Sequence, residues 1–373
     1  MTALLCAATG ERYSADRPRW CGETGGLLDL EFTPRIDPEL FASRGPSLWR
    51  YREAIPVESD AAVVSFSEGF TPLLQVKIAG RTVGVKQDML FPTGSYKDRG
   101  ATVLISKVRE LGVSSVVQDS SGNAGCAVAA YCARGGISCE IFVPEATAPG
   151  KLAQLAWYGA TVHRIPGSRE DTARAALRAA RNSYYASHAW NPFFLHGTKT
   201  FAYEICEQMG WNAPDTLLLP AGNGTLLLGA AIGFSELRSA GVISRIPKLV
   251  AVQSARCAPV WRAFHGTPMG EGDLQNRETL AEGIAIAEPV RGPQMVAAIR
   301  ESGGTVLAVE DDEIVHALRH LSAQGFYVEP TAAAAVAGLL RYLPGSPRDE
   351  RVVTVLTGHG LKSTEKLLSL LSH

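Results

Sequence analysis

Residues 92–100 read P-T-G-S-Y-K-D-R-G, and they are the most informative stretch of this 373-residue sequence. A proline, a glycine and Ser95 predict a turn after a strand, and Ser95 with Asp98 resembles a capping box at a helix start. Lys97 then lies in the first helical turn, where the helix dipole disfavours a charged amine. Because an amine must lose its proton to attack an aldehyde, this position favours imine chemistry. The alternative is a solvated lysine in an ordinary helix start.

The residues on either side of this stretch alternate between short apolar runs and helical patterns. From about residue 83 onward this alternation predicts β-α-β units around mostly parallel sheets, which is an α/β fold. We expect strands at 82–85, 115–118, 140–143, 161–165, 216–219, 248–252, 305–309 and 351–356. We expect helices at 96–111, 122–134, 151–158, 172–182, 200–209, 226–239, 311–323 and 332–342.

Three further turns follow predicted strands. The first, S-S-G-N-A-G at 120–125, opens a helix whose free N–H groups suit a carboxylate. The second, G-N-G-T at 222–225, also opens a helix and suits a phosphate. The third, T-G-H-G-L-K at 357–362, places a hydroxyl at a strand end. Each turn alone fits an ordinary connection, but together with Lys97 they are what a pyridoxal-phosphate (PLP) enzyme acting on an amino acid requires.

The composition excludes several other classes of protein. With 36 basic and 37 acidic side chains the net charge is −1, which argues against nucleic acid and anionic membranes as partners. No apolar run approaches the roughly 20 residues of a membrane span, and no basic segment precedes the apolar N-terminus. Seven scattered cysteines do not resemble a disulfide framework, so a cytoplasmic location is expected.

These motifs, in this order, resemble the fold-type II PLP enzymes, and residues 92–100 are similar to those of threonine synthases in particular. The resemblance extends from E-G-F-T-P at 68–72 to Lys362. It implies two open, twisted, mostly parallel sheets covered by helices, with a small N-terminal ribbon-like appendage. The expected parts are the appendage at 1–45, a large PLP-binding lobe at 46–94 and 201–373, and a small mobile lobe at 95–200.

The resemblance also implies a role for each motif residue. Lys97 would hold the cofactor as a Schiff base and transfer protons, and Asn123 would bond the cofactor's 3-hydroxyl oxygen. Thr357 would bond the pyridine nitrogen. The cofactor phosphate would be bound by Gly222, Asn223, Gly224 and Thr225. The substrate carboxylate would be held by the loop of Ser120, Ser121, Gly122 and Ala124.

Two departures from the family pattern stand out. The ribbon of many relatives has two C-x-x-C pairs, but here Thr9 and Thr24 stand where Cys6 and Cys21 would have their partners. Two thiolates do not make the four-ligand site that structural zinc prefers, so we expect a ribbon that folds without metal. Apart from these two departures, Tyr96 stands where the family usually has phenylalanine, which is a mild change.

The other departure concerns the substrate. Threonine synthases read approximately N-S-x-N-P-x-R-L-E-G-Q-K-T, whereas residues 188–200 read H-A-W-N-P-F-F-L-H-G-T-K-T. The Asn, Ser and Arg that help to grip the substrate phosphate become His188, Ala189 and Phe194. Losing a guanidinium weakens a phosphate site, although His188 and Lys199 could compensate in part.

Three hypotheses therefore stand. The resemblance favours threonine synthase, which converts O-phosphohomoserine and water to threonine and phosphate. The altered pocket favours a lyase that performs β-elimination or β-replacement on serine, threonine, O-phosphoserine or another activated amino acid. The third is a PLP-binding protein without catalysis, against which Lys97, Asn123 and Thr357 argue. Family resemblance further suggests a homodimer.

Overall fold

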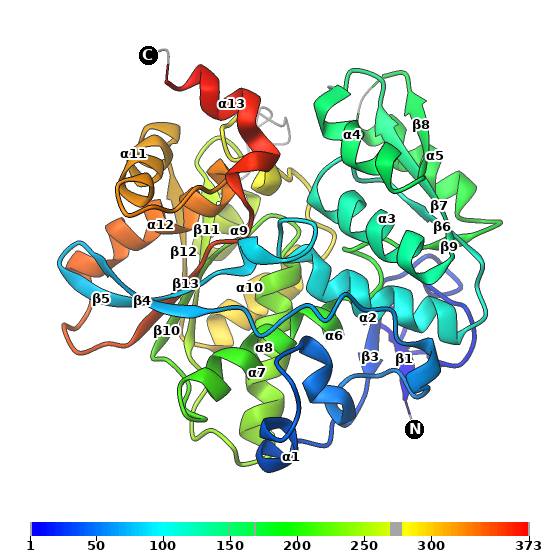
Figure 1. Ribbon diagram of the computed structural model, residues 1–373, viewed down its shortest axis with the longest axis horizontal. Helices are drawn as coiled ribbons and strands as arrows, with labels where there is room; N and C mark the ends of the chain where they lie inside the picture. Colours follow the sequence, from blue (N-terminus) through cyan, green and yellow to red (C-terminus); the bar gives the residue numbers. More distant parts are fainter. Residues whose placement is uncertain (1, 148, 168, 269–277, 372–373) are drawn as a thin grey trace. The chain divides into compact units, whose positions relative to one another are not determined.

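The computed structural model describes residues 2–147, 149–167, 169–268 and 278–371. The chain forms two compact units (Figure 1). The first contains residues 1–69 and 97–198, and the second contains residues 70–96 and the chain from 199 onward. Each unit has its own parallel sheet and its own buried core, so each is described by itself.

The first unit is built on a parallel sheet in the order β8–β7–β6–β9. Because side chains alternate along a strand, Val116 of β6 faces the core of α2 and α3 while Val117 faces α5. Tyr184 and Tyr185 of β9 divide in the same way. The strands are β6 (Ser115–Gln118), β7 (Ser138–Pro144), β8 (Thr161–Ile165) and β9 (Tyr184–Tyr185). The helices are α2 (Lys97–Glu110), α3 (Asn123–Gly135), α4 (Pro149–Trp157), α5 (Arg169–Ala179) and α6 (Pro192–Thr198).

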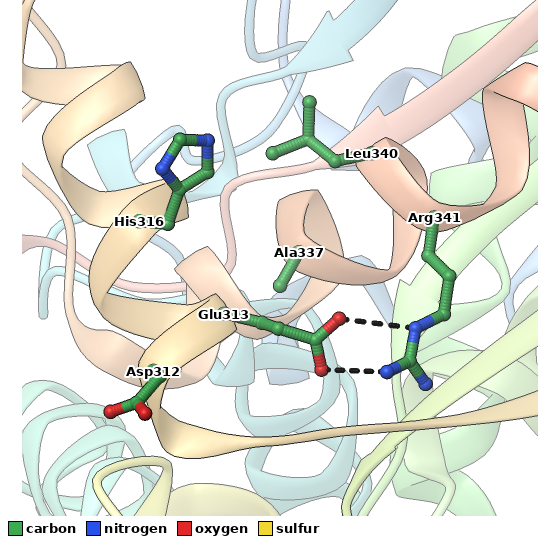
Figure 2. A pocket seen from close by; sticks show the side chains of 6 residues that line it. All are labelled: Asp312, Glu313, His316, Ala337, Leu340 and Arg341. Atoms are coloured by element: carbon green, nitrogen blue, oxygen red, sulfur yellow. Dashed lines mark hydrogen bonds and ion pairs between the residues drawn. The ribbon is translucent and has the colours of Figure 1, made fainter.

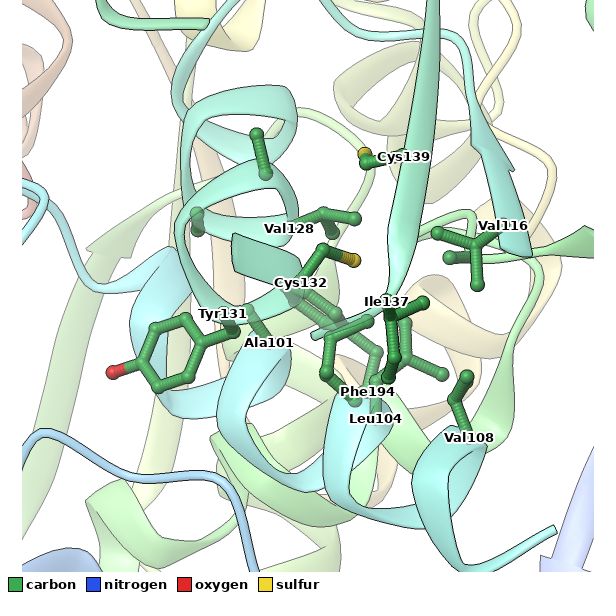
Figure 3. Packing of buried hydrophobic residues seen from close by; sticks show 14 of the residues in the cluster. Ala101, Leu104, Val108, Val116, Val128, Tyr131, Cys132, Ile137, Cys139 and Phe194 are labelled. Atoms are coloured by element: carbon green, nitrogen blue, oxygen red, sulfur yellow. The ribbon is translucent and has the colours of Figure 1, made fainter. Parts of the chain in front are cut away.

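The largest core of this unit lies between α2, α3 and one face of the sheet. Figure 3 shows Leu104 and Val108 of α2 and Val128 of α3 converging on Val116 and Phe194. These side chains are fully buried. At about 25 cal/mol per Å² of buried apolar surface, such a cluster supplies the main favourable term for this unit.

The N-terminal region forms an antiparallel sheet in the order β2–β1–β3. Its strands are β1 (Ala3–Cys6), β2 (Arg12–Ser14) and β3 (Leu28–Glu31). Leu4, Cys6 and Leu28 belong to the same core as α2 and α3, so the ribbon is part of the first unit and not a separate body. The helix α1 (Pro38–Ala42) and the 3₁₀ segments η1 (Leu48–Ala54) and η2 (Asp60–Ala62) follow.

Residues 46–69 also differ from the expected division, which assigned them to the large lobe. They lie in the first unit because Val64 is tied to α2. Its N–H donates to Ser106 Oγ at 2.8 Å, and its carbonyl accepts from Thr102 Oγ1 at 2.7 Å. The expected boundaries near residues 94 and 200 lie within a few residues of those observed.

The second unit has a six-stranded sheet in the order β12–β11–β10–β13–β5–β4, parallel except for the antiparallel edge strand β4. Its strands are β4 (Leu73–Ile78), β5 (Arg81–Lys86), β10 (Thr216–Pro220), β11 (Lys248–Ser254), β12 (Thr305–Val309) and β13 (Val352–Val355). β10 and β13 are neighbours, which places their carboxyl ends side by side.

Helices cover this sheet on both sides, with α12 packed on several strands and α8 and α10 packed on β11 (Figure 1). The helices are α7 (Thr200–Gln208), α8 (Thr225–Ser239), α9 (Pro259–His265), α10 (Gly292–Glu301), α11 (Asp311–Ser322), α12 (Pro330–Tyr342) and α13 (Thr364–Ser369). Short 3₁₀ segments are η3 (Asp88–Leu90), η4 (Glu282–Ile284), η5 (Leu343–Gly345) and η6 (Gly360–Ser363). Among the described helices, none combines the length and apolarity that crossing a bilayer requires.

Candidate active site

In the second unit, two of the predicted motifs leave the same edge of the sheet. Leu218 of β10 pairs with Thr354 of β13 in a parallel register. The turn 222–225 follows β10, and Thr357 follows β13, so both lie just beyond the carboxyl ends of neighbouring strands. This edge is where ligands bind in open α/β sheets.

The turn after β10 opens α8 with an anion-binding geometry. Gly224 is the N-cap residue and has a φ of +76°, which favours glycine, and a Cβ there would lie 2.4 Å from Met295 Sδ. Thr225, the first residue of α8, is buried, and the first turn holds no acidic side chain. Since a glycine cannot cap the N–H groups of the helix, an anion such as a phosphate fits this end.

Residues before Lys97 join this edge as well. Ser95 forms an antiparallel bridge with Gly358, and the Tyr96 N–H donates to the Thr357 carbonyl at 3.0 Å. The Tyr96 hydroxyl lies 3.0 Å from Thr225 Oγ1. Ser95, Tyr96, Thr225 and Thr357 are called the hydroxyl cluster below.

Two members of the hydroxyl cluster are buried with no hydrogen-bond partner among the described residues. Ser95 Oγ and Thr357 Oγ1 both lie out of solvent, on residues that are 0% and 1% exposed. A buried hydroxyl without a hydrogen bond costs about 1–3 kcal/mol of stability, so its presence calls for a functional explanation such as a bound ligand. The expected capping box is also not formed, because α2 begins only at Lys97 and the backbone bridge to Gly358 holds Ser95 outside it.

In the first unit, two helix starts display the other predicted residues. Lys97 is the first residue of α2. Asn123 is the first residue of α3, with Gly122 as its N-cap. Ser120 and Ser121 precede it and are half-buried, and the Gly122 N–H donates to Ser120 Oγ at 3.3 Å. The N–H groups at this helix start suit a carboxylate.

The surroundings of Lys97 in this unit are aromatic. Its Nζ lies 5.9 Å from the centre of the Phe194 ring, and the rings of Phe194 and His188 are 6.0 Å apart. Phe194 packs so closely on α2 that a Cβ at Gly100 would lie 2.3 Å from its ring. Phe194 and Ala189, which stand where the threonine synthase pattern has arginine and serine, are both buried and are called the apolar wall below.

Comparison with known proteins identifies the family of this chain. The family described as pyridoxal-phosphate-dependent enzyme matches residues 64–358, which is more than half of the chain. This chain belongs to that family. It therefore depends on PLP, and the geometry above can be read as part of a PLP enzyme.

The relatives of this PLP enzyme include threonine synthases. The threonine synthase of Methanocaldococcus jannaschii is 37% identical over 96% of this chain and 93% of its own length. That of Methanosarcina acetivorans is 36% identical over 99% of this chain and 94% of its own length. Among solved structures, threonine deaminase isoform 2 of Solanum lycopersicum has a TM-score of 0.71 at 22% identity, covering 96% of this chain and 95% of that one. At that identity the likeness shows the fold alone.

The residues at the sheet edge fit PLP. The α8 start accommodates a phosphate without a side-chain cap, and the buried Thr357 hydroxyl is able to donate to a ring nitrogen. The sequence predicted both roles, and they stay predictions. The sequence marked Tyr96 only as a mild change, and its contact with Thr225 depends on tertiary packing between residues far apart in the chain.

Lys199, which the sequence suggested as a substrate residue, belongs to the second unit and is engaged by a carboxylate there. It is fully buried in the second unit, and its Nζ lies 2.7 Å from Glu236 Oε1. The Tyr203 hydroxyl donates to the same carboxylate. Burial lowers the pKa of Lys199, and the charge of Glu236 offsets this only in part. Glu236 lies about 16 Å along α8 from Thr225, which places the pair away from the phosphate end.

A surface pocket of the second unit lies between α11 and α12 and carries no comparable chemistry. Figure 2 shows Asp312, Glu313 and His316 on one side and Leu340 and Arg341 on the other. Arg341 is paired with Glu313 at 2.8 Å, so the charges satisfy each other. Within the described residues no group of three or more His, Cys, Asp or Glu side chains could hold a metal, in the ribbon or elsewhere.

Proposed function

We propose that this chain is a threonine synthase, which converts O-phosphohomoserine and water to threonine and phosphate. The observation that carries the proposal is the 37% identity to the Methanocaldococcus jannaschii threonine synthase over 96% of the chain. In this reaction the bond between the γ-carbon and the phosphate oxygen breaks, and the oxygen of water bonds to the β-carbon.

The proposed roles belong to residues at the starts of α2 and α3 and at one edge of the second unit's sheet. When bound, PLP supplies the electron sink that stabilises negative charge at the substrate carbons. Lys97 holds the cofactor through its Nζ and then moves protons at the substrate carbons with the same atom. Lys97 is the first residue of α2.

The other roles concern binding. We assign the cofactor phosphate to Gly222, Asn223, Gly224 and Thr225, the ring nitrogen to Thr357 and the 3-hydroxyl oxygen to Asn123. We assign the substrate carboxylate to Ser120, Ser121, Gly122 and Ala124 at the α3 start. His188 lies beside Phe194 and can face the substrate side chain. Lys199 is left out of this assignment, since its ammonium is engaged by Glu236.

A second candidate is a lyase that performs β-elimination or β-replacement on serine, threonine, O-phosphoserine or another activated amino acid. The apolar wall of Phe194 and Ala189 favours it, because phosphate is best gripped by a guanidinium. Sequence identity to threonine synthases over nearly the whole chain favours the first.

Turnover with three substrates separates the candidates. O-phosphohomoserine, O-phosphoserine and threonine are each supplied to the PLP-loaded protein. Threonine and phosphate released from O-phosphohomoserine alone establish the synthase. A keto acid or a replacement product from O-phosphoserine or threonine, with no threonine formed, refutes it in favour of the lyase. Bound PLP without turnover of any substrate supports a non-catalytic protein.

We further propose a homodimer in the cytoplasm. The family resemblance supports the dimer, and the scattered cysteines support a reducing compartment. Light scattering of the purified protein tests the first statement. A mass of one chain at micromolar concentration contradicts it.

A further inference from the structure

We infer that Tyr96 is part of the cofactor's phosphate site, where its hydroxyl orients Thr225 so that the Thr225 proton points at the phosphate. The inference rests on the proposed assignment of residues 222–225 to that phosphate. Tyr96 is a positioning residue in this account, because it acts through Thr225.

Three contacts of the second unit place the Tyr96 side chain. Its hydroxyl lies 3.0 Å from Thr225 Oγ1, on the first residue of α8. Its N–H donates to the Thr357 carbonyl at 3.0 Å, and the preceding residue, Ser95, bridges Gly358. The backbone of Tyr96 is thus tied to the end of β13 while its hydroxyl reaches the helix that follows β10. Since these two strands are neighbours, the ring spans the edge at which the phosphate is expected.

The charge of a phosphate decides the direction of this hydrogen bond. A hydroxyl has one proton to donate and can accept in return. If Tyr96 donates to Thr225 Oγ1, the Thr225 proton is available for a phosphate oxygen. If Thr225 donated to Tyr96, lone pairs of Thr225 would face the anion. The opposite direction would leave only the Tyr96 proton for the anion. Because Thr225 itself begins α8, where the phosphate is expected, a dianion there favours the first direction, and hydrogen bonds to charged groups are the stronger ones. Successive hydroxyls also polarise one another in this direction.

The sequence offers a minimal test, because Tyr96→Phe removes one oxygen and leaves the ring in place. Tyr342 provides a matched control in the same unit. Its hydroxyl lies 3.3 Å from Thr216 Oγ1, another tyrosine–threonine pair. Thr216 begins β10 and Pro220 ends it, so the control pair lies at the opposite end of a strand that is roughly 13 Å long.

The experiment measures the dissociation constants of PLP and of pyridoxal, which lacks the phosphate, for wild type, Tyr96→Phe and Tyr342→Phe. We expect Tyr96→Phe to weaken PLP about three- to tenfold, the effect of one hydrogen bond, and to leave pyridoxal unchanged. Tyr342→Phe should change neither constant. The double variant Tyr96→Phe/Thr225→Val should lose little more PLP affinity than Thr225→Val alone, whereas Thr225→Ser keeps a hydroxyl and should keep the effect of Tyr96.

Two results would overturn the inference while leaving the proposed function intact. One is an equal loss of PLP and pyridoxal in Tyr96→Phe, which would mean a general packing role. The other is a PLP constant unchanged by Tyr96→Phe. Failure of the wild type to bind PLP at all would instead overturn the proposed function, and the inference with it.

Discussion

Two groups of mostly buried polar side chains lie at the same edge of the second unit's sheet, and they differ in how many of their polar atoms are hydrogen-bonded. The first, called the paired cluster, consists of Thr71, Lys86, Glu204 and Gln208. Lys86 Nζ lies 2.7 Å from Glu204 Oε2 and donates to the Thr71 carbonyl at 2.6 Å and to Gln208 Oε1 at 2.8 Å. The Thr71 N–H donates to Glu204 at 3.2 Å.

The hydroxyl cluster lies close by. The carbonyl of Lys86 accepts from the N–H of Leu356, one residue before Thr357. Yet Ser95 Oγ and Thr357 Oγ1 have no partner among the described residues, although they are as deeply buried as Lys86. The two hydroxyls are as deeply buried as Lys86, but only Lys86 has hydrogen-bond partners among the described residues. This difference indicates different roles for the two clusters. The paired cluster stabilises the fold by itself, and the hydroxyl cluster retains donors that a ligand can use.

The largest effect is expected in the paired cluster. Glu204→Gln removes the carboxylate charge that lies 2.7 Å from the fully buried ammonium of Lys86, so we expect a loss of about 3–5 kcal/mol in the free energy of unfolding. Urea unfolding of the PLP-free protein measures it. The double variant Lys86→Met/Glu204→Leu should recover part of the loss, because apolar replacement of both partners removes the uncompensated charge. An exposed ion pair contributes at most about 1 kcal/mol, so a smaller loss in Glu204→Gln would contradict the proposed stabilising role of the paired cluster.

The hydroxyl cluster should respond in the opposite way. Thr357→Val removes a buried hydroxyl that lacks a partner, so the PLP-free protein should keep its stability or gain up to about 1 kcal/mol. The same change should weaken PLP binding about tenfold, since a donor to the ring nitrogen is lost. Unfolding of the cofactor-free protein and PLP titration provide the two readouts. A clear loss of stability without PLP would show that the hydroxyl serves the fold.

The smallest effect concerns Tyr342 at the far end of β10. Its hydroxyl donates to Glu350 Oε1 at 3.0 Å. Burial alone would raise the pKa of Glu350, but hydrogen bonds from Thr216 and Tyr342 and the charge of Lys248 lower it overall. A carboxylate with a lowered folded-state pKa stabilises above its unfolded value of about 4.3, and this stabilisation is lost as pH falls through the folded pKa.

Tyr342→Phe should therefore cost about 1 kcal/mol at pH 7, and the cost should shrink as the pH falls below about 4. Unfolding curves of wild type and variant at several pH values measure it. The PLP dissociation constant should stay unchanged throughout. A cost that grows on acidification would contradict the assigned carboxylate, and altered PLP affinity would remove the distinction between the two ends of β10.

Much of the fold could be predicted from local patterns. Each predicted strand from residue 82 onward corresponds to a strand of the structure, because buried parallel strands read as short apolar runs. The edge strand β4 was missed, since it is antiparallel and partly exposed. The position of residues 46–69 was also missed, because it depends on hydrogen bonds between Val64 and α2 that no local pattern encodes.

The candidate site also combines residues that local patterns indicate with contacts that local patterns do not encode. Lys97, Asn123 and the turn 222–225 were proposed from local motifs, and the structure places each of them at the start of a helix. The engagement of Lys199 by Glu236 and the contact of Tyr96 with Thr225 join residues far apart in the chain. Such contacts depend on tertiary packing, so a single sequence does not reveal them.

The measurement that most directly tests this account is the identification of the residue that holds the cofactor. The PLP-loaded protein is reduced with borohydride, digested and analysed by mass spectrometry, with Lys97→Ala as the control. We expect the reduced cofactor on Lys97 alone, and none in the control variant. Label on another lysine, or a protein that takes up no PLP, would contradict the account.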